Sequence, residues 1–219
     1  KLTRNITTYI APKVITKKVY ENDLLFTNDN SEEVFKFENL NSPILITAPH
    51  SCAMIKEGRE CYRETFSGAI AKTLSDSFKL SCCYKAKPTN YDSNEEYVRD
   101  VSQFVKDNKI KIVLEFHIMN PKRFEDVSLV TNQGYSIDHN IELISILLKT
   151  FILNKFDKIS LDYPFNAFNL NSLVAGIHKN SGAAAVQIIF NQRLFEHKRN
   201  VKRVLKATTE IIKKLNYLV

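Results

Sequence analysis

The run Lys109–His117, KIKIVLEFH, constrains the fold of this chain more than any other stretch. From position 112 to 116 it is apolar except for Glu115, which is typical of a strand buried on both faces of a sheet. It directly follows Asn94–Asn108, where valines recur on one face of an amphipathic helix. A helix that leads into a doubly buried strand indicates a right-handed crossover and a parallel sheet.

Further strands and helices alternate along the rest of the chain. Strands are expected at Pro43–His50, Ser81–Ala86, Asp126–Thr131 and Ala183–Phe195, and helices at Arg63–Phe78, Asp138–Phe156 and Lys198–Leu215. We therefore expect one α/β domain over residues 1–219, with a mixed, mainly parallel central sheet and helices on both faces. Residues 1–40 read as a β-rich edge segment, because short runs such as DLLFT and EVFKF alternate with polar turns, and residues 41–219 as the core.

Composition excludes several classes of protein. The chain has a net charge of +7, but no recognised module or basic-aromatic pattern accompanies it, so we do not expect nucleic acid as a partner. No apolar run approaches the ~20 residues of a membrane span. The four cysteines fit neither a disulfide framework nor a zinc-finger spacing. We expect a cytoplasmic protein, although a leader removed before Lys1 is compatible with the sequence.

Two of the expected strands end on a histidine, His50 and His117. Ligands of an open α/β sheet bind outside the carboxyl ends of its strands, so both side chains can reach one point. The loop after the first histidine carries Glu57, Glu60 and Glu64. Two histidines and a carboxylate are the protein ligands of many catalytic zinc sites. This pattern predicts a metal site, while a structural hydrogen bond is the alternative for either histidine alone.

Several motifs, taken in order, resemble the N-formylglutamate amidohydrolase-like family, which are zinc hydrolases with a fold similar to that of the zinc carboxypeptidases. The motifs are ITAPHS, KEGR, E-x-x-SGAIA, NYD, IKIVLEFH and KRF, and the resemblance covers roughly Ile44–Arg193. It implies a three-layer architecture and a Zn²⁺ ion held by His50, Glu64 and His117. Glu60 is the alternative carboxylate ligand if the register slips.

Five further residues are site candidates: the resemblance implies roles for Arg123, Asn90 and Glu115, and side-chain chemistry or position suggests Arg193 and His178. Arg123 matches a basic residue that holds an anionic substrate, and the planar fork of Arg193 suits a substrate carboxylate, with a surface salt bridge as the alternative. Asn90 in NYD and His178 in the expected loop GIHKNSG are candidates for lining the pocket. Glu115 stands where the family has an aspartate, two residues before the second histidine. From there a carboxylate can orient that metal ligand.

The late strand departs from the family pattern. Gln187 is retained, but Ile189 replaces the glutamate that the family is expected to use as general base. Isoleucine cannot transfer a proton, a step that typically contributes ~10²–10⁴-fold in rate. Three explanations are open: a shifted alignment with Glu196 as the nearest acid, another acid such as Glu60 in its place, or loss of hydrolysis.

The expected function is therefore zinc-dependent hydrolysis of a C–N amide bond in a small anionic acyl-amino-acid or peptide-like substrate. The alternative is a catalytically impaired or inactive relative that acts as a ligand- or protein-binding module. A carboxylate within reach of the open metal position would favour the enzyme, and its absence would favour the binding module.

Overall fold

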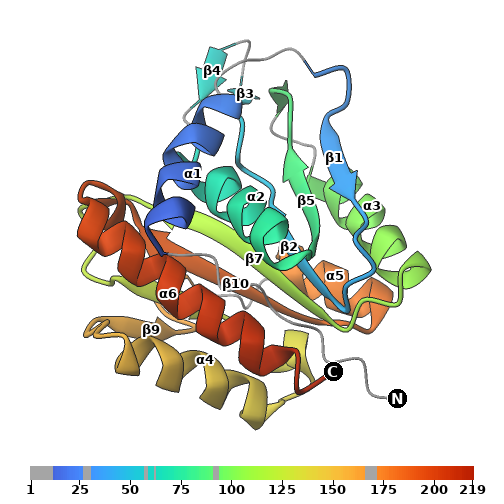
Figure 1. Ribbon diagram of the computed structural model, residues 1–219. Coiled ribbons are helices and arrows are strands. Elements are labelled where there is room, and N and C mark those ends of the chain that lie inside the picture. The colour runs from blue at the N-terminus through green and yellow to red at the C-terminus, as the bar shows by residue number, and fades with distance from the viewer. Residues whose placement is uncertain (1–11, 27–30, 57–58, 62, 91–93, 166–171) are drawn as a thin grey trace, which may run out of the picture.

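The computed structural model describes residues 12–26, 31–56, 59–61, 63–90, 94–165 and 172–219, and its centre is a seven-stranded sheet (Figure 1). The strands run in the order β1 (Phe35–Glu38), β5 (Ser81–Lys85), β2 (Ile44–Ala48), β7 (Ile112–Met119), β10 (Ala184–Asn191), β8 (Val127–Val130) and β9 (Ile159–Leu161). Strands β5, β2, β7 and β10 are parallel. Strand β1 runs antiparallel to β5 and β8 antiparallel to β10, while β9 is parallel to β8. The expected mixed, mainly parallel α/β sheet is confirmed.

Helices cover both faces of this sheet (Figure 1). On one face lie α1 (Pro12–Leu25), α2 (Ser67–Phe78), α4 (Ile141–Leu153) and α6 (Lys198–Leu215), and on the other lie α3 (Asn94–Asp107) and α5 (Leu173–Ser181). Successive strand residues point to opposite faces of the sheet and so enter two different cores. Cys82 packs in the core under α1, α2, α4 and α6, and Cys83 packs in the core under α3 and α5. Strands β2 and β7 are buried along their whole length because both of their faces are covered.

A second, three-stranded sheet lies beyond the carboxyl end of β2. It consists of β4 (Arg59–Cys61), β3 (Met54–Lys56) and β6 (Thr89–Asn90), in that order. Two 3₁₀ helices, η2 (Tyr135–Ile137) and η3 (Gln192–Phe195), complete the described elements. No described helix is long and apolar enough to cross a membrane.

The N-terminal segment differs from the sequence-based expectation. The run DLLFT was expected as a strand, but Asp23–Leu25 form the last turn of α1. Short apolar runs do not distinguish a strand from a helix by periodicity, and here tertiary packing decides. Val19 is fully buried, and the ring of Tyr20 meets Phe66 edge to face at 5.7 Å. The run EVFKF is confirmed as the antiparallel edge strand β1.

Three element boundaries also differ from expectation. Helix α4 begins after Asn140, whose side chain accepts a hydrogen bond from the Leu143 N–H at 2.9 Å, and not at Asp138. Helix α2 begins at Ser67 because Phe66 has a left-handed backbone with φ 76°. Strand β10 ends at Asn191, and η3 follows it.

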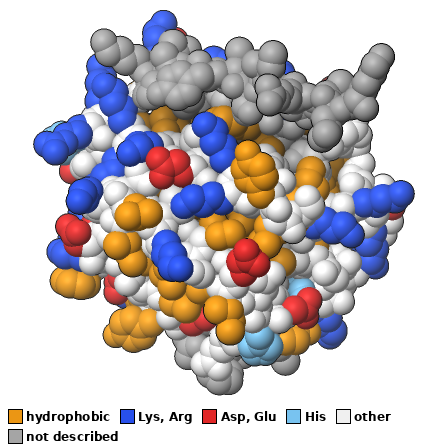
Figure 2. Space-filling view, turned by 60° about the horizontal axis from the view of Figure 1, so that its bottom comes forward, with side chains coloured by type: hydrophobic (Ala, Val, Ile, Leu, Met, Phe, Trp, Pro, Cys, Tyr) orange, Lys and Arg blue, Asp and Glu red, His pale blue; other side chains and the backbone are white. Residues whose placement is uncertain are grey.

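On the face shown in Figure 2, lysine and arginine side chains are interspersed with acidic and apolar ones. The apolar side chains that stand out from the described surface include Phe124, Ile141, Ile152, Leu153 and Tyr163. This face therefore carries a mixed surface, without a continuous basic area among its described residues.

Gly68, at the start of α2, tests how tightly the segments around β2 are packed. A Cβ atom there would lie 2.5 Å from Ser51 Cβ and 2.7 Å from Phe26 Cζ. We expect Gly68→Ala to lower the free energy of unfolding by about 1–3 kcal/mol, because the new methyl group overpacks this contact. Urea denaturation measures the change. Lys206→Ala, on the exposed side of α6, is the control and should change it by less than about 0.5 kcal/mol; an equal effect would contradict the close packing.

Candidate metal centre

Three side chains from separate segments meet at the carboxyl edge of the central sheet. His50 lies in the turn after β2, Glu64 in the loop before α2, and His117 two residues before the end of β7. Glu64 Oε1 lies 2.9 Å from His50 Nδ1 and 3.2 Å from His117 Nδ1. The ligand atoms of all three residues lie within 4.8 Å of one another. The structure thus brings together the three residues that the resemblance implied as metal ligands.

Backbone contacts hold the first histidine and the carboxylate together. The Glu64 N–H donates to the His50 carbonyl oxygen at 3.0 Å. The Ser51 hydroxyl lies 2.9 Å from the carbonyl oxygen of Ala48 and 2.7 Å from that of Lys85. These contacts attach the turn that contains His50 to the carboxyl ends of both β2 and β5.

Helix α1 fixes the loop that carries Glu64. The Asp23 carboxylate accepts two hydrogen bonds from the Arg63 guanidinium, at 2.9 and 3.2 Å, and one from the Phe66 N–H at 2.9 Å. The second oxygen of Glu64 accepts from the Ile118 N–H at 2.9 Å. Glu64 is therefore held from both sides, so a bound ion would find its carboxylate already oriented.

A buried network orients His117 from behind. Its Nε2 lies 3.0 Å from Glu115 Oε1, and the side chain of Glu115 is fully buried. Gln187 Nε2 donates to the same oxygen at 2.8 Å, and the Tyr97 hydroxyl donates to Oε2 at 3.1 Å. A carboxylate on the far nitrogen of a histidine fixes the ring and leaves the other nitrogen for a metal. Here that other nitrogen is Nδ1, which lies 3.2 Å from Glu64 Oε1.

The charges of the three groups are strongly coupled. Burial alone would raise the pKa of Glu64, but His117 and His50 outweigh it and lower the pKa from 4.5 to about 2. Burial alone would lower the pKa of His117, but the carboxylates of Glu64 and Glu115 raise it from 6.5 to about 10. Without a metal, the centre therefore holds an imidazolium ion between carboxylates. A cation that binds at Nδ1 must displace its proton.

Ile189 lies beside this centre. In the parallel pairing of β10 with β7 it stands opposite His117, on the same face of the sheet. It packs with Met119, Val130 and Phe165, so this side of the centre is an apolar wall. Ile189 occupies the position at which the family resemblance implies a glutamate. Glu196, the nearest later acid, is exposed at the end of η3.

The two arginines lie on or against the loop between β7 and β8. The guanidinium of Arg193 donates to the Phe124 and Glu125 carbonyl oxygens at 2.8 and 3.0 Å, and pairs with Asp126 Oδ1 at 2.7 Å. It therefore braces this loop. Arg123 is exposed, and its guanidinium lies 5.5 Å from the ring centre of Phe165. Their roles in substrate binding stay predictions.

Of the other candidates, His178 is described and is not brought to the centre. His178 lies in α5 and not in a loop, and its Nδ1 is 3.0 Å from the carbonyl oxygen of Ala183, next to the amino end of β10. It therefore sits at the opposite end of that strand from Ile189. Asn90 lies in β6 and Glu60 in β4, but their side chains, like Glu57, fall outside the described part of the chain.

Sequence reasoning missed two supporting residues. Tyr97 shares the apolar face of α3 with the valines, which concealed its hydrogen bond to Glu115. Asp23 was assigned to a strand, so nothing linked it to Arg63. The pairing of Gln187 with Glu115 follows from the register of β10 and β7, which the sequence alone does not give.

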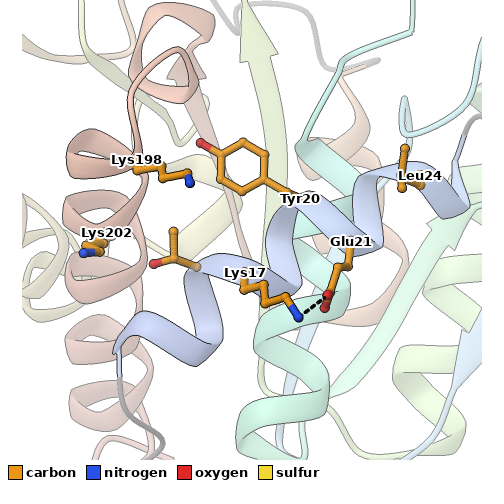
Figure 3. Close-up of a pocket in the computed structure, with 7 residues that line it drawn as sticks. Lys17, Tyr20, Glu21, Leu24, Lys198 and Lys202 are labelled. Carbon is orange, nitrogen blue, oxygen red and sulfur yellow. Dashed lines mark ion pairs between the residues drawn. The ribbon is translucent and has the colours of Figure 1, made fainter.

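A pocket of about 480 Å³ lies between α1 and α6, away from this centre (Figure 3). Tyr20 and Leu24 contribute its apolar lining, and Lys17, Lys198 and Lys202 stand at its rim. Lys17 is paired with Glu21 at 3.1 Å. None of the three residues of the candidate metal centre lines this pocket.

Known structures share this fold at low sequence identity. A gene product of Agrobacterium tumefaciens matches with a TM-score of 0.60 and 13% identity, over 84% of this chain and 93% of its own. N-formylglutamate amidohydrolase from Ralstonia eutropha matches with a TM-score of 0.52 and 9% identity, over 82% and 98%. A bacteriophage poly-gamma-glutamate hydrolase matches with a TM-score of 0.52 and 12% identity, over 87% and 92%.

The resemblance inferred from the sequence is therefore confirmed at the level of the fold. The chain has the fold of N-formylglutamate amidohydrolase and of related amide hydrolases. No protein-family model matches the sequence, and no curated protein does.

The coupled pair predicts how the stability of the metal-free protein depends on pH. Below pH 6.5 the protonated His117 contributes fully to the free energy of unfolding. This contribution is lost as the pH rises towards about 10. Above pH 4.5 the ionised Glu64 contributes fully to the same free energy. Its contribution is lost as the pH falls towards about 2. The melting temperature with a chelator present should therefore be highest between pH 4.5 and 6.5. Glu64→Gln should flatten both sides of the profile; an unchanged profile would contradict the coupling.

The carboxylate behind His117 predicts the effect of one conservative substitution. Glu115→Gln keeps the shape of the side chain but removes the charge that orients the ring. We expect zinc affinity to fall ~10–100-fold, measured by competition with a chromophoric chelator. Glu95→Gln, on the exposed side of α3, is the matched control. Equal zinc affinity in the two variants would show that Glu115 has no part in metal binding.

Proposed function

We propose that this protein is a zinc-dependent hydrolase that cleaves a C–N amide bond in a small anionic acylated amino acid or peptide. The observation that carries the proposal is the convergence of His50, Glu64 and His117, whose ligand atoms lie within 4.8 Å of one another. Two histidines and a carboxylate are a common protein ligand set of catalytic zinc. A zinc ion held there would polarise the amide carbonyl and lower the pKa of a bound water towards ~7.

Other residues of the chain would orient the metal ligands. Glu115, Gln187 and Tyr97 keep His117 in one orientation, and Asp23 keeps the Glu64 loop in place. The side chain of His50 is 22% exposed, against 8% for that of His117. Substrate would therefore approach from the side of His50.

One observation supports the substrate class and another the compartment. N-formylglutamate amidohydrolase and poly-gamma-glutamate hydrolase share the fold, and the substrates in both names contain an amide bond and a carboxylate. Cys52, Cys82 and Cys83 are buried thiols that form no disulfide with one another, which suits a reducing compartment, and we place the activity in the cytoplasm.

Ile189 supports a second candidate function. The apolar wall that it forms with Met119 and Val130 offers no group that can move a proton beside His117. A chain that keeps the metal ligands but lacks a base would bind a small anionic ligand without cleaving it. The two functions differ in turnover and share the metal centre.

Restoring the acid separates these candidates. Ile189→Glu places a carboxylate opposite His117, and we expect it to raise the rate of N-formylglutamate hydrolysis by the zinc-loaded protein ~10²–10⁴-fold. Ile189→Gln, of similar size but unable to transfer a proton, is the matched control. Released formate is measured for both variants and for the unchanged protein.

The outcomes differ between the candidates. Slow turnover by the unchanged protein that disappears in His117→Ala supports the hydrolase. No turnover by the unchanged protein, with activity only in Ile189→Glu, supports the binding module. No turnover by any of them, with zinc bound, contradicts the proposed substrate class.

A further inference from the structure

Helix α4 is apolar on the side that faces solvent as well as on the side that faces the core. Its residues are Ile, Leu or Phe at all but four positions, which are Glu142, Ser145, Lys149 and Thr150. Leu147 is buried in the core, but Ile141, Ile152 and Leu153 are 83%, 60% and 69% exposed. A helix with apolar side chains on all sides is normally covered on all sides. The outer face of α4 is therefore suited to a protein partner.

The outer face has a regular pattern along the helix. Ile141, Leu148 and Ile152 recur at intervals of seven and four residues, so they lie in one row. Beside this row stand Glu142 and Lys149, which are both exposed. They are seven residues apart, which is about two helical turns. The face thus carries its negative charge near the start of α4 and its positive charge near the end.

A pocket of about 510 Å³ lies at the start of α4. Its apolar lining comes from Ile137, from Ile141 and Ile144 of α4, and from Leu161 of the edge strand β9. In Figure 1, α4 and β9 lie together at the bottom of the molecule. The exposed side chains of Ile152 and Leu153 stand at the other end of the same helix. One end of α4 therefore offers an apolar pocket, and the other offers apolar side chains that project from the surface.

Two copies of α4 that pack antiparallel across a two-fold axis match these features. The end of each helix then meets the start of the other, so Ile152 and Leu153 of one chain reach the pocket beside Ile141 of the second chain. The same axis places Glu142 of each chain opposite Lys149 of the other. Such an interface uses the same surface on both chains and closes at two copies.

The charges on this face favour a second copy of the chain over a lipid surface. Amphipathic helices that lie on membranes are rich in lysine and arginine on their polar face. Helix α4 carries one lysine, Lys149, and one glutamate, Glu142. This balanced pair is complementary to itself in the antiparallel arrangement, whereas it gives no net attraction to an anionic membrane.

We propose that this protein forms a homodimer through antiparallel packing of α4. Ile152 and Leu153 of each chain fill the pocket at the start of α4 in the other chain, and two pairs of Glu142 with Lys149 fix the register. None of His50, Glu64 and His117 lines this pocket, so the dimer leaves the candidate metal centre outside its interface. The proposal does not rest on the proposed function.

Sedimentation equilibrium over a range of micromolar concentrations tests the proposal. We expect the unchanged protein to have the mass of two chains. Ile152→Asp should raise the dissociation constant of the dimer at least about a hundredfold, because a carboxylate would be buried in an apolar pocket. Leu24→Asp is the matched control, since Leu24 of α1 is 64% exposed, and it should dimerise like the unchanged protein.

Reversal of the two charges tests the antiparallel register. Glu142→Lys and Lys149→Glu should each raise the dissociation constant about tenfold, because like charges then face each other across the interface. The double variant Glu142→Lys/Lys149→Glu restores opposite charges. It should dimerise within about threefold of the unchanged protein.

The mass of a single chain at every concentration would overturn the proposal. Equal dimer stability in Ile152→Asp and Leu24→Asp would also overturn it, as would a double charge reversal that dimerises no better than the single ones. Circular dichroism establishes that each variant is folded. If Ile152→Asp does not fold, Ile152→Ser replaces it, and the charge variants test the same interface independently.

Discussion

The Glu64 carboxylate is the contact on which the rest of this centre depends. One oxygen faces Nδ1 of both His50 and His117, and the other accepts from the Ile118 N–H. Its loop is held to β2 through the His50 carbonyl oxygen and to α1 through Asp23. The ends of β2 and β7 therefore meet at this side chain, and α1 holds the loop that carries it. Charge concentrated in a buried position is costly unless it is paired, so this cluster needs either a proton on His117 or a cation at the same place.

Much of this could be predicted from the sequence, for identifiable reasons. The apolar run before His117 predicted a central strand. Parallel strands bring their carboxyl ends to one edge of the sheet, so His50 was expected near His117. Glu64 followed only from the family resemblance, since a loop residue has no periodicity. Helix α1 was missed because its short apolar runs fit a strand equally well, and its packing against α2 and α6 is a tertiary property. The network behind His117 needed the strand register.

The centre combines the convergence of His50, Glu64 and His117 with one unusual neighbour. On the β10 side of His117, Ile189 offers an apolar surface where the resemblance implies an acid. Because this surface carries no proton acceptor, an acid that assists hydrolysis would have to come from another side of the centre.

The most direct test of this account is the metal content of the protein purified without added metal or chelator, beside His50→Ala/His117→Ala. The account predicts about one zinc ion per chain, which is lost in the double variant. Two histidines and a carboxylate are the three protein ligands that a catalytic zinc site needs. No zinc in the unchanged protein, even after zinc is offered, would contradict it. The two histidines would then be structural residues that share a buried carboxylate.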